Sequence, residues 1–276
     1  MLYNGSIGDT TAKEERVLEY ALVTENLTRR YGRFTALRDL SMHVPKGAIY
    51  GFVGKNGAGK TTLIRLICGL QTPTSGGYSL YGNAHDGKGI VAARRKMGAV
   101  VETPAFYPGM TAAGNLREQF RFLGLSSFDG VAPLLKLVGL ENTGRKKARQ
   151  FSMGMKQRLG IAMALAGEPD FLVLDEPING LDPQGIIEMR ALLTRLNREK
   201  GVTVLISSHI LDELSRLATH YGFIDGGRIV REMSAEALEA ACRKSMRVET
   251  TDGRALSRVL TDMNAEYEML TDTGED

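Results

Sequence analysis

The sequence predicts an α/β fold with a mostly parallel core sheet, and three observations predict it. Short apolar runs such as Phe171–Leu174 are typical of strands buried on both faces of a parallel sheet. Segments with apolar residues at helical spacing alternate with these runs, and such βα alternation places helices over a parallel sheet. From residue 111 to residue 168 the helical spacing continues, which predicts a helical block inserted into the α/β framework.

The N-terminal half begins with a loose polar leader over residues 1–19. Strands are expected over about 21–28, 37–44 and 48–53, because β-branched and aromatic residues there are bounded by Gly and Pro turns. A helix is expected from about Gly59 to Cys68, where Gly69 provides a stop. Cys68 is expected to lie in the core of this helix.

The C-terminal half continues the alternation. Asp182 as N-cap and Pro183 as first helical residue predict a helix to about Lys200, closed by Gly201. A buried strand over 202–206 and a helix over 210–218 should follow. We expect the main domain to occupy residues 20–232. The tail over 233–276 is expected to form a small α/β lobe of helix, strand, helix and strand.

Composition limits the function classes. The chain has 276 residues, and its 35 Lys and Arg against 32 Asp and Glu leave a net charge of +3, too balanced to favour a dedicated nucleic-acid binder. Two cysteines without a CxxC pair predict neither a disulfide framework nor a zinc site, and fit a reducing cytosol. No run approaches the roughly 18 apolar residues of a membrane span, and the N-terminus does not resemble a signal peptide. Any role at a membrane is therefore expected to act through a partner.

A glycine-rich phosphate-binding pattern follows the expected strand over 48–53. The pattern G-x-x-x-x-G-K-[ST] covers Gly54, Lys55, Asn56, Gly57, Ala58, Gly59, Lys60 and Thr61, with Thr62 next. Glycines let backbone N–H groups wrap a triphosphate, Lys60 adds a positive charge for the β and γ phosphates, and the Thr61 hydroxyl can ligate Mg²⁺. A Gly-rich turn with an exposed lysine is the structural alternative. The position between strand and helix favours nucleotide binding.

Two carboxylates end the strand Phe171–Leu174. A carboxylate at the end of a buried parallel strand can reach a metal ion held by a phosphate loop, and Asp175 fits that role. Glu176, the next residue, is placed to take a proton from an attacking water. The alternative, in which both acids merely cap the next segment, is less consistent with the phosphate loop upstream.

With these motifs the chain resembles the ATP-binding subunits of ABC transporters, over about residues 21–232. Ser152 and Gly154 match the signature loop of that family, while Met153 and Met155 replace a glycine and a glutamine. In the family this loop caps the γ-phosphate bound by a second subunit, so the resemblance implies a dimer around two ATP molecules. It also implies a P-loop NTPase fold with a mostly parallel core sheet, an antiparallel β subdomain and an inserted α-helical subdomain.

Three further positions take their roles from this resemblance. Asp182 fits the D-loop, which crosses the dimer interface; His209 fits the switch histidine that contacts the γ-phosphate; and Tyr31 matches the aromatic that stacks on adenine. A turn tyrosine is the alternative for Tyr31. The remaining histidines are expected to be structural: His43, His85 and His220.

Glu102 departs from the family pattern, which has a glutamine bonding to Mg²⁺ and the attacking water here. A glutamate can also ligate Mg²⁺, but its charge opposes the γ-phosphate; the alternative is that Glu102 faces solvent. Together with the signature stretch, this glutamate is similar to subunits of bacitracin and lantibiotic resistance exporters.

The resemblance implies an ATPase that uses ATP and Mg²⁺ and drives export of a peptide antibiotic or other drug-like substrate. Its partners would be an integral membrane permease and a second copy of itself, not nucleic acid, and it would lie peripherally on the cytoplasmic face of the cell membrane. A soluble non-transport ABC ATPase and an ATP-dependent regulatory module are the alternatives. The basic run 145–149 is expected to be a solvated face, or else a contact to the membrane partner or to lipid headgroups.

Overall fold

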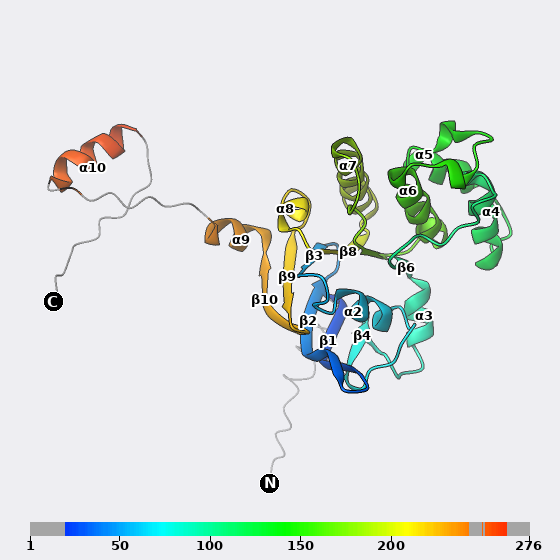
Figure 1. Cartoon of the computed structure of the whole chain (residues 1–276), viewed down its shortest axis with the longest axis horizontal. Coiled ribbons are helices and arrows are strands. Elements are labelled where there is room, and N and C mark those ends of the chain that lie inside the picture. The colour runs from blue at the N-terminus through cyan, green and yellow to red at the C-terminus, as the bar shows by residue number, and fades with distance from the viewer. Residues whose placement is uncertain (1–19, 243–249, 251, 264–276) are drawn as a thin grey trace, which may run out of the picture. The chain divides into compact units, whose positions relative to one another are not determined.

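The computed structural model describes residues 20–242, 250 and 252–263. The chain divides into two compact units, residues 1–238 and 239–276. The first unit holds both sheets and the helical block (Figure 1). The predicted leader over residues 1–19 lies outside the described residues.

A six-stranded sheet forms the centre of the first unit. Its strand order is β10-β9-β3-β8-β7-β6. Strands β3, β9, β8, β7 and β6 run parallel, and β10 joins β9 antiparallel at the edge. The strands are β3 (Ile49–Val53), β6 (Met97–Val100), β7 (Phe171–Asp175), β8 (Thr203–Ser208), β9 (His220–Asp225) and β10 (Arg228–Ser234). The predicted mostly parallel core sheet is confirmed.

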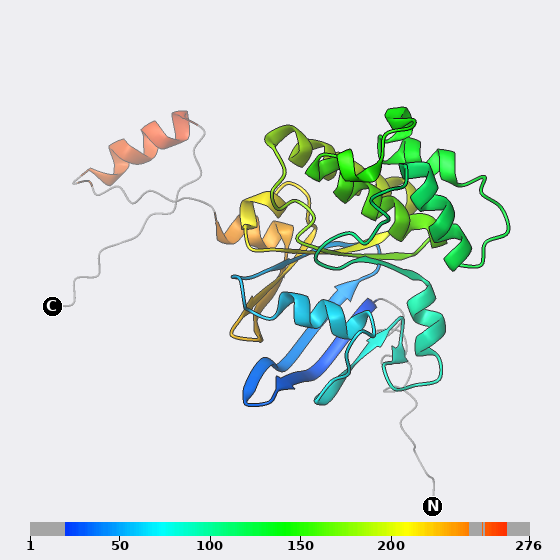
Figure 2. The same cartoon turned by 45° about the vertical axis from the view of Figure 1, so that its right-hand side comes forward.

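Apolar cores cover both faces of this sheet. Along β7, Leu172 and Leu174 belong to one buried cluster, whereas Phe171 and Val173 belong to another. Because successive side chains of a strand point to opposite faces, a strand covered on both faces must be apolar throughout. Figure 2 shows structure on both sides of this sheet, with helices of the inserted block on one side and the antiparallel strands on the other. Cys68 packs against the second cluster, and burial raises the pKa of its thiol to about 12.

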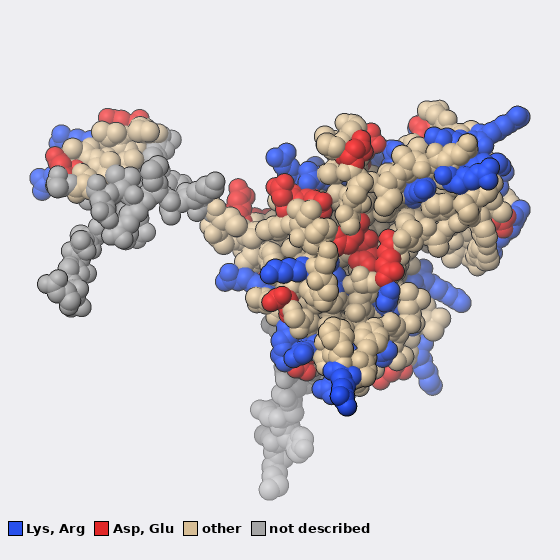
Figure 3. Space-filling view, in the orientation of Figure 1, with Lys and Arg blue, Asp and Glu red and all other residues tan. Residues whose placement is uncertain are grey.

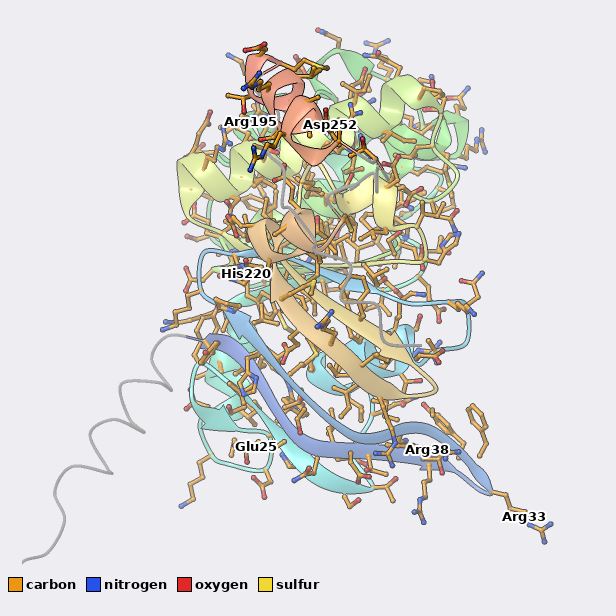
Figure 4. The ribbon with its side chains drawn as sticks, turned by 90° about the vertical axis from the view of Figure 1, so that its left-hand side faces the viewer. Glu25, Arg33, Arg38, Arg195, His220 and Asp252 are labelled. Carbon is orange, nitrogen blue, oxygen red and sulfur yellow. The ribbon has the colours of Figure 1, made fainter. Side chains whose placement is uncertain are left out.

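A second, antiparallel sheet lies on one side of the core sheet together with α2 (Lys60–Ile67) and α3 (Ile90–Arg95) (Figure 2). Its order is β2-β1-β4-β5. The strands are β1 (Tyr20–Tyr31), β2 (Phe34–Pro45), β4 (Ser75–Leu80) and β5 (Asn83–Ala84). The β1–β2 hairpin turns through Gly32 at φ 58°, and Arg33 lies at its tip (Figure 4). The predicted antiparallel subdomain is confirmed.

The inserted helical block lies on the other side of the core sheet (Figure 2). Thr111 caps its first helix by accepting a hydrogen bond from the Gly114 N–H at 3.0 Å. The block comprises α4 (Ala112–Phe122), α5 (Val131–Leu137), the 3₁₀ turns η1 (Glu141–Thr143) and η2 (Ala148–Gln150), α6 (Met153–Ala164) and η3 (Leu165–Gly167). The predicted inserted α-helical subdomain is confirmed.

Helix α7 (Pro183–Lys200) has the predicted caps, Asp182 at its start and Gly201 at φ 66° at its end. Helix α8 (Leu211–Leu214) is much shorter than the predicted helix over 210–218, so that prediction was wrong in length. The Thr219 N–H already donates to the Ile49 carbonyl at 2.8 Å, because the chain must turn here to enter β9. Pairing with the central strand β3 therefore ends the helix.

The tail contains two described helices, α9 (Ala235–Ala241) and α10 (Gly253–Asp262). Asp252 caps α10 by accepting from the Ala255 N–H at 3.0 Å. After β10 ends at Ser234, the described part of the tail contains no further strand, and residues 243–249, 251 and 264–276 lie outside the described residues. Across the described ranges, no helix is long and apolar enough to cross a membrane.

Candidate functional site

The carboxyl ends of four neighbouring parallel strands meet at one edge of the core sheet. In the register, Asp175 of β7 pairs with Ser207 of β8, and Ser208 pairs with Val53 of β3. The phosphate-loop sequence follows β3 directly, and Glu102 follows β6 after one further residue. Figure 3 shows acidic side chains gathered on the surface. They lie at the place where Figure 1, in the same orientation, labels β8 and β6. The edge therefore collects the predicted loop and carboxylates from distant parts of the sequence.

The phosphate loop joins β3 to α2 through Gly59, which adopts φ 110°. A Cβ on Gly59 would approach the Ala36 carbonyl oxygen to 2.7 Å, so this position requires glycine for both conformation and space. Lys60 is only 6% exposed. Its Nζ donates to the Gly54 carbonyl at 2.6 Å and lies 3.2 Å from Glu176 Oε1. The ammonium is thus held at the mouth of the loop.

Asp175 is held by hydroxyl groups from two other elements. Thr61, at the start of α2, donates to Asp175 Oδ2 at 2.8 Å. Ser207, fully buried one residue before the end of β8, donates to Asp175 Oδ1 at 2.6 Å. Each carboxylate oxygen of Asp175 thus has a fixed partner, which orients the group toward the phosphate loop.

Glu176 stands between two predicted site residues. Its Oε1 lies 3.2 Å from Lys60 Nζ, and its Oε2 lies 2.8 Å from Nδ1 of His209. Its backbone has φ 49°, and its N–H donates to the Ser207 hydroxyl at 2.9 Å. A carboxylate fixed at both oxygens and at its backbone is suited to accepting a proton from a water in a defined position.

The donor set fits Mg²⁺ bound together with a nucleotide. Among the described residues, no three His, Cys, Asp or Glu side chains come together as a metal site. A hydroxyl and one carboxylate, as offered by Thr61 and Asp175, are what Mg²⁺ needs when substrate phosphates and waters complete its octahedron. The residues present therefore fit the metal that the sequence predicted.

Glu102 contacts a residue outside the group formed by Lys60, Thr61, Asp175, Glu176, Ser207 and His209. It has φ 58°, and its side chain forms an ion pair with Arg65 of α2. The Glu102 side chain is 54% exposed, so it reaches the solvent as the alternative interpretation supposed, but it also has a cationic partner. The structure shows no contact between Glu102 and Asp175.

Tyr31 lies at the end of β1, at the hairpin tip, and is 38% exposed. The guanidinium carbon of Arg29 lies 4.9 Å from the centre of its ring, and its hydroxyl donates to Gln71. Burial alone would raise the pKa of Tyr31, but hydrogen bonds with Arg29, Gln71 and Thr62 outweigh it and lower the pKa. The contact with Thr62 places the ring near the phosphate-loop helix.

The predicted signature and D-loop residues line a cleft of their own. Ser152 caps α6 by accepting from the Met155 N–H at 3.3 Å, and Asp182 caps α7 by accepting from the Gly185 N–H at 3.3 Å. Ser152, Gly154 and Asp182 line one cleft of 180 Å³. Two capped helix starts therefore face the same cleft, where their N-terminal dipoles favour an anion.

The sequence patterns did not predict two residues that contact the site. Ser207 connects Asp175 to Glu176, and its position one residue after the apolar run ending at Ile206 could have revealed it. Arg65 partners Glu102 and lies four residues after Thr61, at the spacing that places two residues on one helix face. The other histidines have structural contacts, with Glu232 for His43, Tyr78 for His85 and Thr219 for His220.

Comparisons with known proteins define the class. A family model described as ABC transporter matches residues 37–179. The chain is 41% identical over 260 residues to the bacitracin transport ATP-binding protein BcrA of Enterococcus faecalis, covering 94% of this chain and 83% of that protein. It is also 41% identical over 218 residues to the lantibiotic transport ATP-binding protein SrtF of Streptococcus pyogenes, covering 79% and 93%.

Solved structures agree with this class. The cbiO1 protein of Clostridium perfringens, part of an ABC transporter complex, has a TM-score of 0.72 at 26% identity and covers 89% of this chain and 96% of that one. The dimeric ABC transporter cassette MJ0796 has a TM-score of 0.70 at 28% identity, with 78% and 98% covered. The chain belongs to the ABC transporter family and carries its ATP-binding domain. It is an ATPase with the fold that the sequence predicted.

Proposed function

We propose that this chain is the ATP-hydrolysing subunit of an exporter for a peptide antibiotic or a similar drug-like substrate. The single observation that carries the catalytic part is the position of Glu176 between Lys60 and His209. The substrate class is supported by the relatives named for bacitracin and lantibiotic transport, which match most of the chain.

Nucleotide binding is assigned to the loop after β3 and to the hairpin tip. Backbone N–H groups of the glycine-rich loop would surround the phosphates, and the Lys60 ammonium would exchange part of its contact with Gly54 for a phosphate oxygen. Tyr31, exposed near Thr62, would stack on the adenine. Lys55, Asn56, Gly57, Ala58 and Gly59 would contribute through their backbone.

Thr61 and Asp175 would hold Mg²⁺, and Glu102 is proposed as a further oxygen ligand from the end of β6. The metal, when bound, neutralises charge on the phosphates and so favours attack on them. Ser207 keeps Asp175 oriented by donating to the oxygen that Thr61 does not contact.

Glu176 is proposed as the general base. Its carboxylate would accept a proton from the attacking water while the water oxygen forms a bond to the γ-phosphorus and the bond to the ADP oxygen breaks. His209 contacts Glu176 Oε2 and would hold that oxygen in place, while Lys60 contacts Oε1. The three side chains would therefore act as one unit.

A second copy of the chain is the proposed partner across the nucleotide. Ser152 and Gly154 at the start of α6 would face the γ-phosphate bound by that copy, with Asp182 at the shared interface. The relative MJ0796 was solved as a dimer, which supports this arrangement. An integral membrane permease would be the second partner, with the chain bound peripherally at the cytoplasmic face of the membrane.

The test is Glu176→Gln, which removes the base while keeping the shape of the side chain. We expect ATP hydrolysis to fall about 10²- to 10⁴-fold, with ATP still bound. Gel filtration with Mg-ATP should then shift the variant from monomer to dimer. Hydrolysis at the wild-type rate would remove Glu176 from the role of base.

The transport part is tested in cells that express the chain together with a candidate membrane permease. Resistance to bacitracin or a lantibiotic should rise with the wild-type chain and not with Glu176→Gln. Equal resistance with both chains would overturn the proposed export role while leaving the ATPase assignment intact.

A further inference from the structure

Arg65 lies in α2, the helix that follows the phosphate loop, and was given no role in the predicted site. It belongs to the last turn of α2, and Thr61, four residues earlier, belongs to the first. Residues four apart on a helix share a face, and Thr61 faces Asp175 at 2.8 Å. Arg65 therefore lies one helical turn from the proposed metal site, on the side of the helix that faces it.

The partner of Arg65 is Glu102. The ion pair joins Arg65 Nη2 to Glu102 Oε1, and neither side chain has a second ion pair among the described residues. Both side chains reach the solvent, with 38% of Arg65 and 54% of Glu102 exposed. Glu102 follows β6, which lies beside the strand carrying Asp175, so the pair connects α2 to the edge strand of the core sheet.

We propose that Arg65 is the positioning residue and counter-charge that allow a glutamate to stand at position 102. A carboxylate near the triphosphate repels it, and the repulsion grows as water is excluded. The Arg65 guanidinium offsets this charge and fixes the direction of the carboxylate. A glutamine at position 102 would carry no charge to offset and would gain little from Arg65. This inference rests on the proposed function, because it places Glu102 beside the bound nucleotide.

The test is a double-mutant cycle on the full chain with four proteins: wild type, Arg65→Gln, Glu102→Gln and the double variant. The measurement is the equilibrium Kd of a fluorescent ATP analogue, first with EDTA and then with Mg²⁺. Arg121→Gln serves as the matched control, because it breaks another arginine–glutamate pair, Arg121 with Glu118 on α4.

With EDTA we expect Arg65→Gln to raise the Kd about three- to fivefold, the upper range for an ion pair whose side chains are this exposed to solvent. In the Glu102→Gln background the same change should alter the Kd by less than about twofold, so the double variant should bind nearly as Glu102→Gln does. With Mg²⁺ the effect of Arg65→Gln should shrink, because the metal supplies positive charge that Arg65 otherwise provides. Arg121→Gln should leave the Kd unchanged.

An equal fold-change for Arg65→Gln in both backgrounds would overturn the proposal, since Arg65 would then act on the nucleotide or on folding rather than through Glu102. Thermal unfolding of all four proteins separates loss of folding from loss of coupling. If the wild-type chain itself binds no ATP, the proposed function fails, which is a different result from uncoupled variants.

Discussion

Ser207 offers the sharpest test of how the site is organised, through the substitution Ser207→Ala. Its hydroxyl is fully buried, donates to Asp175 Oδ1 at 2.6 Å and accepts from the Glu176 N–H at 2.9 Å. Alanine removes both hydrogen bonds and leaves the chain otherwise unchanged. Asp175 Oδ1 loses the one donor it has within the described ranges, and the Glu176 N–H loses its acceptor.

The magnitude follows from these two bonds. A hydrogen bond to a charged group contributes about 1.5–3 kcal/mol, and a buried N–H left unpaired costs about 1–3 kcal/mol. The two contributions are not independent, because one hydroxyl makes both bonds. We therefore expect the free energy of unfolding to fall by about 3 kcal/mol, near the low end of the two ranges added together. For a unit of this size that corresponds to a fall in Tm of roughly 6–12 °C.

Activity should respond separately from stability. Asp175 without its anchor should hold Mg²⁺ less well, and loss of such an orienting partner typically costs about 10- to 100-fold in metal affinity or activity. The assay is the ATPase rate titrated with Mg²⁺, together with thermal unfolding. The Mg²⁺ concentration for half-maximal rate should rise in Ser207→Ala.

Thr203→Val is the matched control. Thr203 is also buried in β8, and its hydroxyl accepts from the Gly47 N–H at 2.9 Å, at the opposite end of the strand from the site. This variant should lower the Tm but leave the Mg²⁺ dependence unchanged. If Ser207→Ala and Thr203→Val shift the Mg²⁺ curve equally, or neither shifts it, the reasoning about Asp175 is wrong.

Two further predictions concern charged groups. Lys60→Ala should weaken binding of a fluorescent ATP analogue by roughly 10- to 150-fold, because a charged contact contributes about 1.5–3 kcal/mol; wild-type affinity would contradict the role of Lys60. The second uses pH. The hydrogen bond with Glu232 raises the pKa of His43 above its usual 6.5, so its stabilising effect is complete below pH 6.5 and is lost as the pH rises through the raised pKa. The Tm difference between wild type and His43→Gln should therefore be larger at pH 5.5 than at pH 9, and a difference that grows with pH would refute this assignment.

Local patterns in the sequence were sufficient for many of the helices and strands and for much of the site. The phosphate loop has its strand before it and its helix after it, because glycine conformation and the start of α2 are decided by neighbouring residues. The caps of α7 at Asp182 and Gly201 follow from the same short-range chemistry. The apolar run Phe171–Leu174 predicted a doubly covered strand, because both faces of a strand must be apolar when a parallel sheet lies between two cores.

The contacts between side chains of the site could not be predicted from the sequence, because they depend on the order of the strands in the sheet. β8 lies between β3 and β7, and only this order places Ser207 against Asp175 and His209 against Glu176. The shortened helix α8 has a similar origin, since Thr219 must reach Ile49 to start β9.

The sequence by itself therefore determined the class of fold, the phosphate loop and the two acids at the end of β7, because each depends on residues close together in the chain. The tertiary structure alone decided the partners of those acids and the pairing of Glu102 with Arg65. The physical reason is that a side chain's partner is set by which elements pack together, and packing sums weak contacts over the whole core that no short stretch of sequence contains.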